Sequence, residues 1–217
     1  MKVKWLGHAC FLLTSEGGLR IITDPYTPGA YGLDYAPPSE RADIVTVSHD
    51  HADHNNVAAV KGSPQVVKGS GIQEVKGIQF SGVATAHDPS GGKERGPNTI
   101  FTFTLDGVTV CHLGDLGHSL DDQTVAEIGP VDVLLIPVGG NFTVDAIIAS
   151  EVCERLKPKV CIPMHFSNRR CPNFPVAGVD DFVARRQVVR LLDTSEVEIT
   201  KGGLPIIMET IVLKPAR

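Results

Sequence analysis

The segment SHDHADHNN at residues 48–56 constrains the fold more than any other part of the chain, because it directly follows the apolar run IVTV at 44–47. A short run of this composition predicts a strand that is buried on both faces. Three histidines and two aspartates then fall within six positions. Buried polar groups need hydrogen-bond partners or a metal ion, since their desolvation is costly. The segment therefore predicts a polar site at the end of a core strand.

Further histidines and aspartates stand where other predicted strands end. These residues are Asp24 after IIT, His87 after VATA, Asp115 after VCHLG and His165 after VCIPM. In layered α/β proteins the ends of strands converge on a shared crevice. We therefore expect the four side chains to meet the 49–54 cluster in space.

Imidazole and carboxylate together suit zinc, iron or manganese, and zinc is the favoured ion. We predict two metal sites. The first is built from three imidazoles, those of His49, His51 and His87. The second combines one carboxylate with two imidazoles, those of Asp53, His54 and His165. Asp115 is predicted to bridge the two ions.

Two ions ~3.5–4 Å apart generate a bridging hydroxide near neutral pH and stabilise an oxyanion. The predicted reaction is therefore hydrolysis of an ester, lactone, thioester, amide or phosphodiester. Four residues are candidates for a catalytic role besides metal binding: Asp53, Asp24, His8 and His118. Asp24 is expected to stay off the metals and to orient a ligand histidine. His8 lines the pocket or protonates a leaving group, or else is a structural histidine; whether His118 faces the pocket is open.

Basic residues and irregular loops near the predicted ligands suggest where a substrate binds. Arg169 and Arg170 follow His165 closely and could hold a phosphate or carboxylate, because arginine pairs with such anions in a bidentate manner. The alternative is two solvated loop arginines. The loop segments 25–39 and 88–98 directly follow two predicted site residues, Asp24 and His87. We therefore expect both loops to line the pocket.

The order of these motifs resembles the metallo-β-lactamase superfamily. HDHADH at 49–54, preceded by Asp24 and followed by His87, Asp115 and His165, matches all five of its motifs. The resemblance implies an α/β (α+β) fold, the four-layer αββα sandwich, with the metals at one edge between two sheets. WLGHACFLL and the segment 114–118 are similar to the small hydrolases related to ascorbate-6-phosphate lactonase. That subgroup implies a small ester or lactone substrate, with or without a phosphate group.

Two departures from better-known members narrow the function. Asp115 stands where the zinc β-lactamases have cysteine, and His51 stands where flavodiiron relatives have a carboxylate. Both favour a hydrolase that does not degrade antibiotics or reduce oxygen. Three alternatives stay open: a phosphodiesterase or nuclease acting on a cyclic nucleotide or short nucleic acid, a di-iron redox protein, and a metal-binding module without turnover.

Composition limits the partners. The net charge is -5, with 20 Lys+Arg against 25 Asp+Glu, which disfavours nucleic acid as a partner. No apolar run approaches the ~20 residues that cross a bilayer, and the first 13 residues predict a strand rather than a signal peptide. The five widely spaced cysteines indicate reduced thiols in the cytoplasm. We expect a small-molecule substrate and no membrane partner; the sequence leaves a homo-oligomer open.

The order of predicted elements indicates a single domain over residues 1–217. Short strands separated by loops are predicted as far as residue 113, with a hairpin at Asp106-Gly107. Helices are then predicted at 121–128, 144–156 and 181–192, separated by buried strands. This order favours two sheets with helices on their outer faces.

Overall fold

The first sheet has six strands in the order β13-β1-β2-β3-β4-β5. The computed structural model describes residues 1–217. The strands are β1 (Lys2–Gly7), β2 (Cys10–Thr14), β3 (Arg20–Thr23), β4 (Ile44–Val47), β5 (Gln65–Lys68) and β13 (Glu196–Glu198). β13, β1, β2 and β3 pair antiparallel, whereas β3, β4 and β5 are parallel. The carboxyl ends of β3 and β4 therefore lie at the same edge.

The second sheet has eight strands in the order β12-β14-β11-β10-β9-β8-β7-β6. They are β6 (Gly71–Val75), β7 (Ile78–Ala86), β8 (Pro97–Leu105), β9 (Val108–His112), β10 (Val133–Pro137), β11 (Val160–Met164), β12 (Val188–Leu191) and β14 (Glu209–Val212). β6 to β9 form an antiparallel meander, and β9, β10, β11, β14 and β12 are parallel. The predicted hairpin between β8 and β9 is confirmed, with Leu105 paired to Val108.

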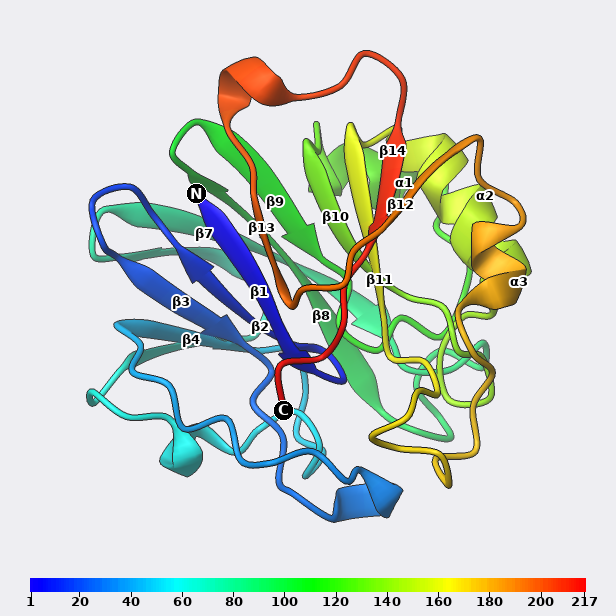
Figure 1. Ribbon diagram of the computed structural model, residues 1–217, viewed down its shortest axis with the longest axis horizontal. Helices are drawn as coiled ribbons and strands as arrows, with labels where there is room; N and C mark the ends of the chain where they lie inside the picture. The colour runs from blue at the N-terminus through cyan, green and yellow to red at the C-terminus, as the bar shows by residue number, and fades with distance from the viewer.

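Helices accompany only the second sheet. They are α1 (Asp122–Ile128), α2 (Ala146–Leu156) and α3 (Asp180–Val183), and Figure 1 shows them gathered on one flank beside β10, β11 and β14. The predicted helices at 121–128 and 144–156 are confirmed, each capped by an aspartate, Asp121 and Asp145. None of the helices has the length and apolar character that crossing a bilayer requires.

The helices expected on the outer face of the six-stranded sheet are absent, and loops cover this face instead. Ile21 and Ile44 belong to the main core of 43 residues, which draws side chains from both sheets. Their neighbours Ile22 and Val45 point to the opposite face and join a second cluster of 12 residues, which includes Tyr35 from the loop after β3. This double burial explains why β4 is apolar throughout. The short 3-10 turns are η1 (Ala30–Gly32), η2 (Val57–Ala59) and η3 (Lys201–Gly203).

The predicted helix at 181–192 is wrong. α3 ends at Val183, and Val188–Leu191 forms the edge strand β12, paired in parallel with β14. Apolar residues at both ends of this segment imitate a helical period, but pairing with the exposed edge of β14 decides the conformation. Arg190 consequently lies on an edge strand, with its Nε 3.5 Å from Oε1 of Glu209. The segment 65–68, not predicted as a strand, forms the edge strand β5, which is polar and mostly exposed.

Strand ends from both sheets meet at one edge of the sandwich. β3 and β4 end there from the first sheet, and β7, β9 and β11 end there from the second, because β7 and β9 both run antiparallel to β8. The residues that follow these five strands are the predicted site residues. Strand direction, rather than distance along the chain, therefore brings them together.

Candidate metal centre

Asp115 lies at the centre of the histidine cluster. Its Oδ2 atom is 3.1 Å from Nε2 of His54, 3.1 Å from Nε2 of His87 and 3.3 Å from Nε2 of His165. Nε2 of His49 is 3.9 Å away. One buried carboxylate oxygen therefore faces four imidazole nitrogens from three different segments of the chain.

The histidines on one side of Asp115 form a group of three. These are His49, His51 and His87, whose donor atoms all lie within 4.8 Å of one another. Nε2 of His49 is 3.1 Å from Nδ1 of His51. The structure thus brings together the three imidazoles predicted for the first metal site.

A second group lies on the other side of Asp115. It consists of His8, Asp53, His54 and His165, again with donor atoms within 4.8 Å of one another. Nε2 of His8 is 3.1 Å from Oδ2 of Asp53. Sequence reasoning placed His8 near the pocket but gave it no part in metal binding. The available signal was its position directly after β1, because the other cluster residues also follow strands.

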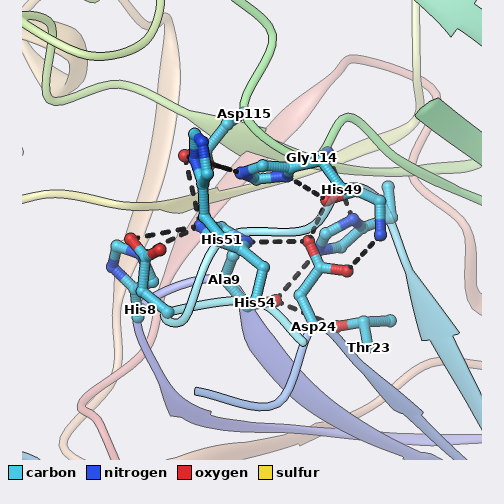
Figure 2. A network of polar contacts seen from close by, with 12 residues as sticks. His8, Ala9, Thr23, Asp24, His49, His51, His54, Gly114 and Asp115 are labelled. Atoms are coloured by element: carbon cyan, nitrogen blue, oxygen red, sulfur yellow. Dashed lines mark hydrogen bonds and ion pairs between the residues drawn. The ribbon is translucent and has the colours of Figure 1, made fainter. Parts of the chain in front are cut away.

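Asp24 contacts His54 from outside the cluster, and its carboxylate is fully buried. Its Oδ2 lies 2.9 Å from Nδ1 of His54 and accepts a hydrogen bond from the hydroxyl of Ser48 at 2.5 Å. Its Oδ1 accepts from the backbone N–H of Ser48 at 2.8 Å. Figure 2 shows this network, in which His54 turns its Nδ1 to Asp24 and its Nε2 toward Asp115. Asp24 is therefore placed to fix the orientation of a ring in the second group.

The backbone around the cluster adopts unusual conformations. His8, Asp24 and His165 have positive φ angles of 52°, 36° and 52°, which cost on the order of 1–3 kcal/mol each for residues with a side chain. Gly114 has a φ of +56°, and a Cβ there would lie 2.3 Å from Oδ1 of Asn98 and 2.6 Å from Cβ of Ser48. Only glycine lets the chain before Asp115 approach the end of β4 so closely.

The histidines of the cluster differ in the direction in which their pKa values are shifted. Burial, with a smaller contribution from His165, lowers the pKa of His8 to about 4. Burial and the neighbouring His54 lower the pKa of His49 to about 3. Burial also disfavours charge on His54, but Asp115 and Asp53 outweigh it and raise the pKa of His54 well above its usual value. Without a metal, a proton on His54 therefore balances the buried carboxylates at neutral pH.

Metal binding is expected to release this proton. A cation at the second group needs the Nε2 lone pair of His54 and replaces the positive charge that the carboxylates now attract. We expect a net release of protons at pH 7, from His54 and from His87, whose pKa is also raised because Asp115 outweighs its burial. The metal affinity should fall as the pH is lowered, because protons then compete more strongly with the metal. Isothermal titration of zinc into chelator-treated protein, in buffers of different ionisation enthalpy, measures the release. Equal heats in all buffers would contradict the prediction.

The remaining predicted site residues lie outside the cluster. Nε2 of His118 accepts a hydrogen bond from the backbone N–H of Ala86 at 3.2 Å, so this ring contacts the end of β7. Arg169 and Arg170 are exposed and line a separate cavity of about 420 Å³ with Trp5 and Phe166. The structure does not bring these three side chains to the metal ligands.

A cavity of about 200 Å³ opens onto the cluster. Five predicted ligands line it: His51, Asp53, His87, Asp115 and His165. Four more residues complete the lining, and sequence reasoning did not single them out: Tyr31, Arg95, Phe142 and Phe174. Tyr31 and Arg95 come from the two loops that were expected to wall the pocket. Phe142 and Phe174 follow β10 and β11, where no polar motif marked them.

The cluster fits divalent cations on its own chemistry. Its donors are imidazole nitrogens and carboxylate oxygens, the set that zinc, manganese and iron share. Oδ1 of Asp53 and Oδ1 of Asp115 are buried without a hydrogen-bond partner. Buried polar atoms are rarely left in this state, and a bound cation would satisfy both.

Comparison with known proteins agrees with this chemistry. The family model described as the Beta-lactamase superfamily domain matches residues 2–165, a range that contains every residue of the cluster. The chain belongs to the metallo-β-lactamase superfamily. The structure has the two-sheet sandwich fold that the sequence motifs predict, and it contains few helices.

Proteins with similar sequences identify a smaller family within this superfamily. A UPF0173 metal-dependent hydrolase of Carboxydothermus hydrogenoformans is 36% identical over 208 residues, covering 83% of this chain and 88% of the relative. Another, from Archaeoglobus fulgidus, is 32% identical over 94% of this chain and 97% of the relative. A crystal structure from Thermotoga maritima, named a candidate Zn-dependent hydrolase of the metallo-β-lactamase superfamily, superposes with a TM-score of 0.79 at 36% identity, covering 98% of this chain and 99% of that one. The chain therefore also belongs to the UPF0173 family of metal-dependent hydrolases; its resemblance to ascorbate-6-phosphate lactonase stays a prediction.

Proposed function

We propose that this protein hydrolyses an ester or lactone bond in a small substrate at a centre of two divalent metal ions, most readily zinc, with manganese or iron as alternatives. One observation carries the proposal. Oδ2 of Asp115 lies 3.1–3.3 Å from imidazole nitrogens that belong to both ligand groups. A carboxylate in this position can be shared between two ions, whereas a single closed structural site would not need it.

The two groups would hold one ion each. His49, His51 and His87 would hold the first, and Asp53, His54 and His165 the second, with His8 as a further nitrogen beside it. Asp115 would contact both. Ions bound there supply a nucleophile from water at neutral pH and stabilise negative charge on the attacked oxygen.

The chain's own residues fix the geometry for this reaction. The Asp24 carboxylate is placed to accept the Nδ1–H of His54, so that the Nε2 lone pair would face the cluster once a metal has displaced the second proton of the ring. The Ser48 hydroxyl donates to Asp24, and its oxygen lies 2.9 Å from Nδ1 of His49. His54 contacts the buried Asp24, and His49 contacts the Ser48 hydroxyl that is bonded to Asp24. These contacts fix both rings, so the rings need no reorganisation when a metal or substrate binds.

The cavity supports a small substrate. About 200 Å³ is less than the usual volume of a drug-sized ligand site, roughly 300–1,000 Å³. Tyr31, Phe142 and Phe174 give it an apolar wall, which suits the carbon skeleton of an ester or lactone. A nucleic acid strand would instead need a groove rich in cations, and one arginine lines this cavity.

Metal content and a matched substrate panel test the proposal. Elemental analysis of protein purified without chelator is expected to give about two equivalents of metal per chain. The metal-loaded protein is then assayed with δ-valerolactone, p-nitrophenyl acetate, a thioester and bis(p-nitrophenyl) phosphate. We expect lactone or ester turnover that is lost on chelation and restored by zinc, manganese or iron.

Other outcomes would replace the proposal. Faster turnover of the phosphodiester than of any ester would assign a phosphodiesterase. Full metal content without turnover of any substrate would favour a metal-binding module. Absence of metal after reconstitution with all three ions would overturn the two-metal mechanism itself.

A further inference from the structure

Arg95 is the one lysine or arginine among the nine residues that line the cavity at the metal centre. It also lines an adjoining cavity of about 540 Å³, and the only residues common to the two cavities are His51 and Arg95. Its guanidinium carbon lies 5.8 Å from the ring centroid of Phe142, on the apolar wall. Arg95 thus stands at the boundary between the two cavities, together with a predicted metal ligand.

The loop that carries Arg95 is held by a single buried carboxylate. Asp88, directly after His87, is fully buried. Its two oxygens accept hydrogen bonds from four backbone N–H groups, those of Ser90, Gly92, Glu94 and Arg95, at 2.8–3.0 Å. The loop is therefore anchored next to a metal ligand, and Arg95 is held in place through its own backbone. Such pre-organisation lowers the entropy that binding a ligand would otherwise cost.

The charge of Arg95 is not neutralised by a buried partner. Its nearest carboxylate is that of Glu94, 3.7 Å from Nη1, and the Glu94 side chain is 57% exposed. Exposed pairs of this kind contribute little, so the guanidinium keeps donors for another anion. Lys68, the other cation in the adjoining cavity, is already paired with both carboxylate oxygens of Asp50 at 2.5 Å.

We propose that Arg95 binds an anionic oxygen group of the substrate, a carboxylate or a phosphate, and so makes the site selective for negatively charged esters or lactones. This inference rests on the proposed function, because the scissile bond must lie at the metal centre in the same cavity. Arginine suits the task through its planar, bidentate donors, which a lysine cannot reproduce. Arg169 and Arg170, at a separate cavity, would not contribute.

Two chromogenic esters that differ in charge test the proposal on metal-loaded protein. p-Nitrophenyl acetate is neutral, and the mono-p-nitrophenyl ester of succinate carries one carboxylate. In Arg95→Gln we expect the KM for the succinate ester to rise roughly 10-fold or more, because a charge-assisted hydrogen-bonded pair is lost. The kinetics of the acetate ester should change less than about 2-fold, and Arg95→Lys should be intermediate. Arg169→Gln is the matched control and should behave as the wild type.

Direct binding separates this inference from the proposed function. Titration of succinate and of inorganic phosphate into metal-loaded wild type and Arg95→Gln needs no turnover. A roughly 10-fold weaker affinity of the variant for either anion, at unchanged metal content, supports anion binding by Arg95 even if neither ester is cleaved. The anion whose affinity falls more, succinate or phosphate, identifies the chemical group that Arg95 binds. Equal affinities, or an equal effect of Arg95→Gln on both esters, would overturn the proposal.

Discussion

Replacing Asp115 with asparagine is expected to reduce bound metal from about two equivalents to one or fewer and to lower kcat/KM roughly 1,000-fold, because several kcal/mol of stabilisation by the metal centre are lost. Oδ2 of Asp115 lies within 3.1 Å of both ligand groups, measured to Nε2 of His54 and to Nε2 of His87. Asparagine has nearly the same shape but no charge, so the substitution isolates the carboxylate. Elemental analysis and steady-state kinetics measure the effect.

The same segment of sequence offers a matched control for this variant. Asp50→Asn removes the charge of an aspartate that lies between two cluster histidines in the chain but points to Lys68 and is 69% exposed. Its metal content and kinetics should remain those of the wild type. Unfolding of each variant, followed by circular dichroism, shows whether the Asp115 substitution acts on the site or on the whole fold. Two equivalents of metal and normal kinetics in Asp115→Asn would exclude a bridging role.

Replacing Asp24 with asparagine is expected to weaken metal binding roughly 10- to 100-fold, the usual effect of losing a partner that orients a ligand. Asp24 accepts three hydrogen bonds, from His54 and from two groups of Ser48. An amide has one oxygen, so at least one donor must face its NH₂ group. If this donor is His54, its Nδ1 loses the acceptor that keeps the hydrogen there, and Nε2 becomes protonated in place of holding a metal.

The Asp24 substitution should also destabilise the protein by about 2 kcal/mol, because a buried donor is left without an acceptor. For a chain of this size the melting temperature should fall by roughly 4–8 °C. Asp43→Asn is the control, since Asp43 accepts from Arg20 at the opposite end of the same strand pair and is only partly buried. Competition with a chromogenic chelator gives the metal affinities. A normal affinity in Asp24→Asn would mean that the fold alone orients His54.

The strands and the metal ligands follow local rules, so much of this protein could be predicted from its sequence. The apolar run 44–47 is buried on both faces in the structure, and His49 and His51 lie together as their spacing on extended backbone predicts. The Asp106-Gly107 turn could also be predicted, because few residues accept its positive φ angles.

Other features depended on contacts that sequence spacing does not encode. The segment 188–191 has apolar residues that suit a helix, yet β14 exposes an edge that pairs with it as β12. Arg169 follows His165 by four positions but lines another cavity, whereas Arg95, 70 positions away from His165, shares its cavity. Nearness along the chain is a poor guide here, because loops leave a strand end in any direction.

The sequence by itself determined the chemistry of this protein: which side chains can bind a metal, and that each follows a strand. A strand pattern and a ligand type are properties of a few adjacent residues. Only the tertiary structure decided which atoms meet: that one oxygen of Asp115 faces four imidazoles, that His8 joins the second group, and that the histidine which Asp24 contacts is His54. These relations join residues up to 157 positions apart, from His8 to His165. They are fixed by the packing of two sheets against each other, which no local pattern specifies.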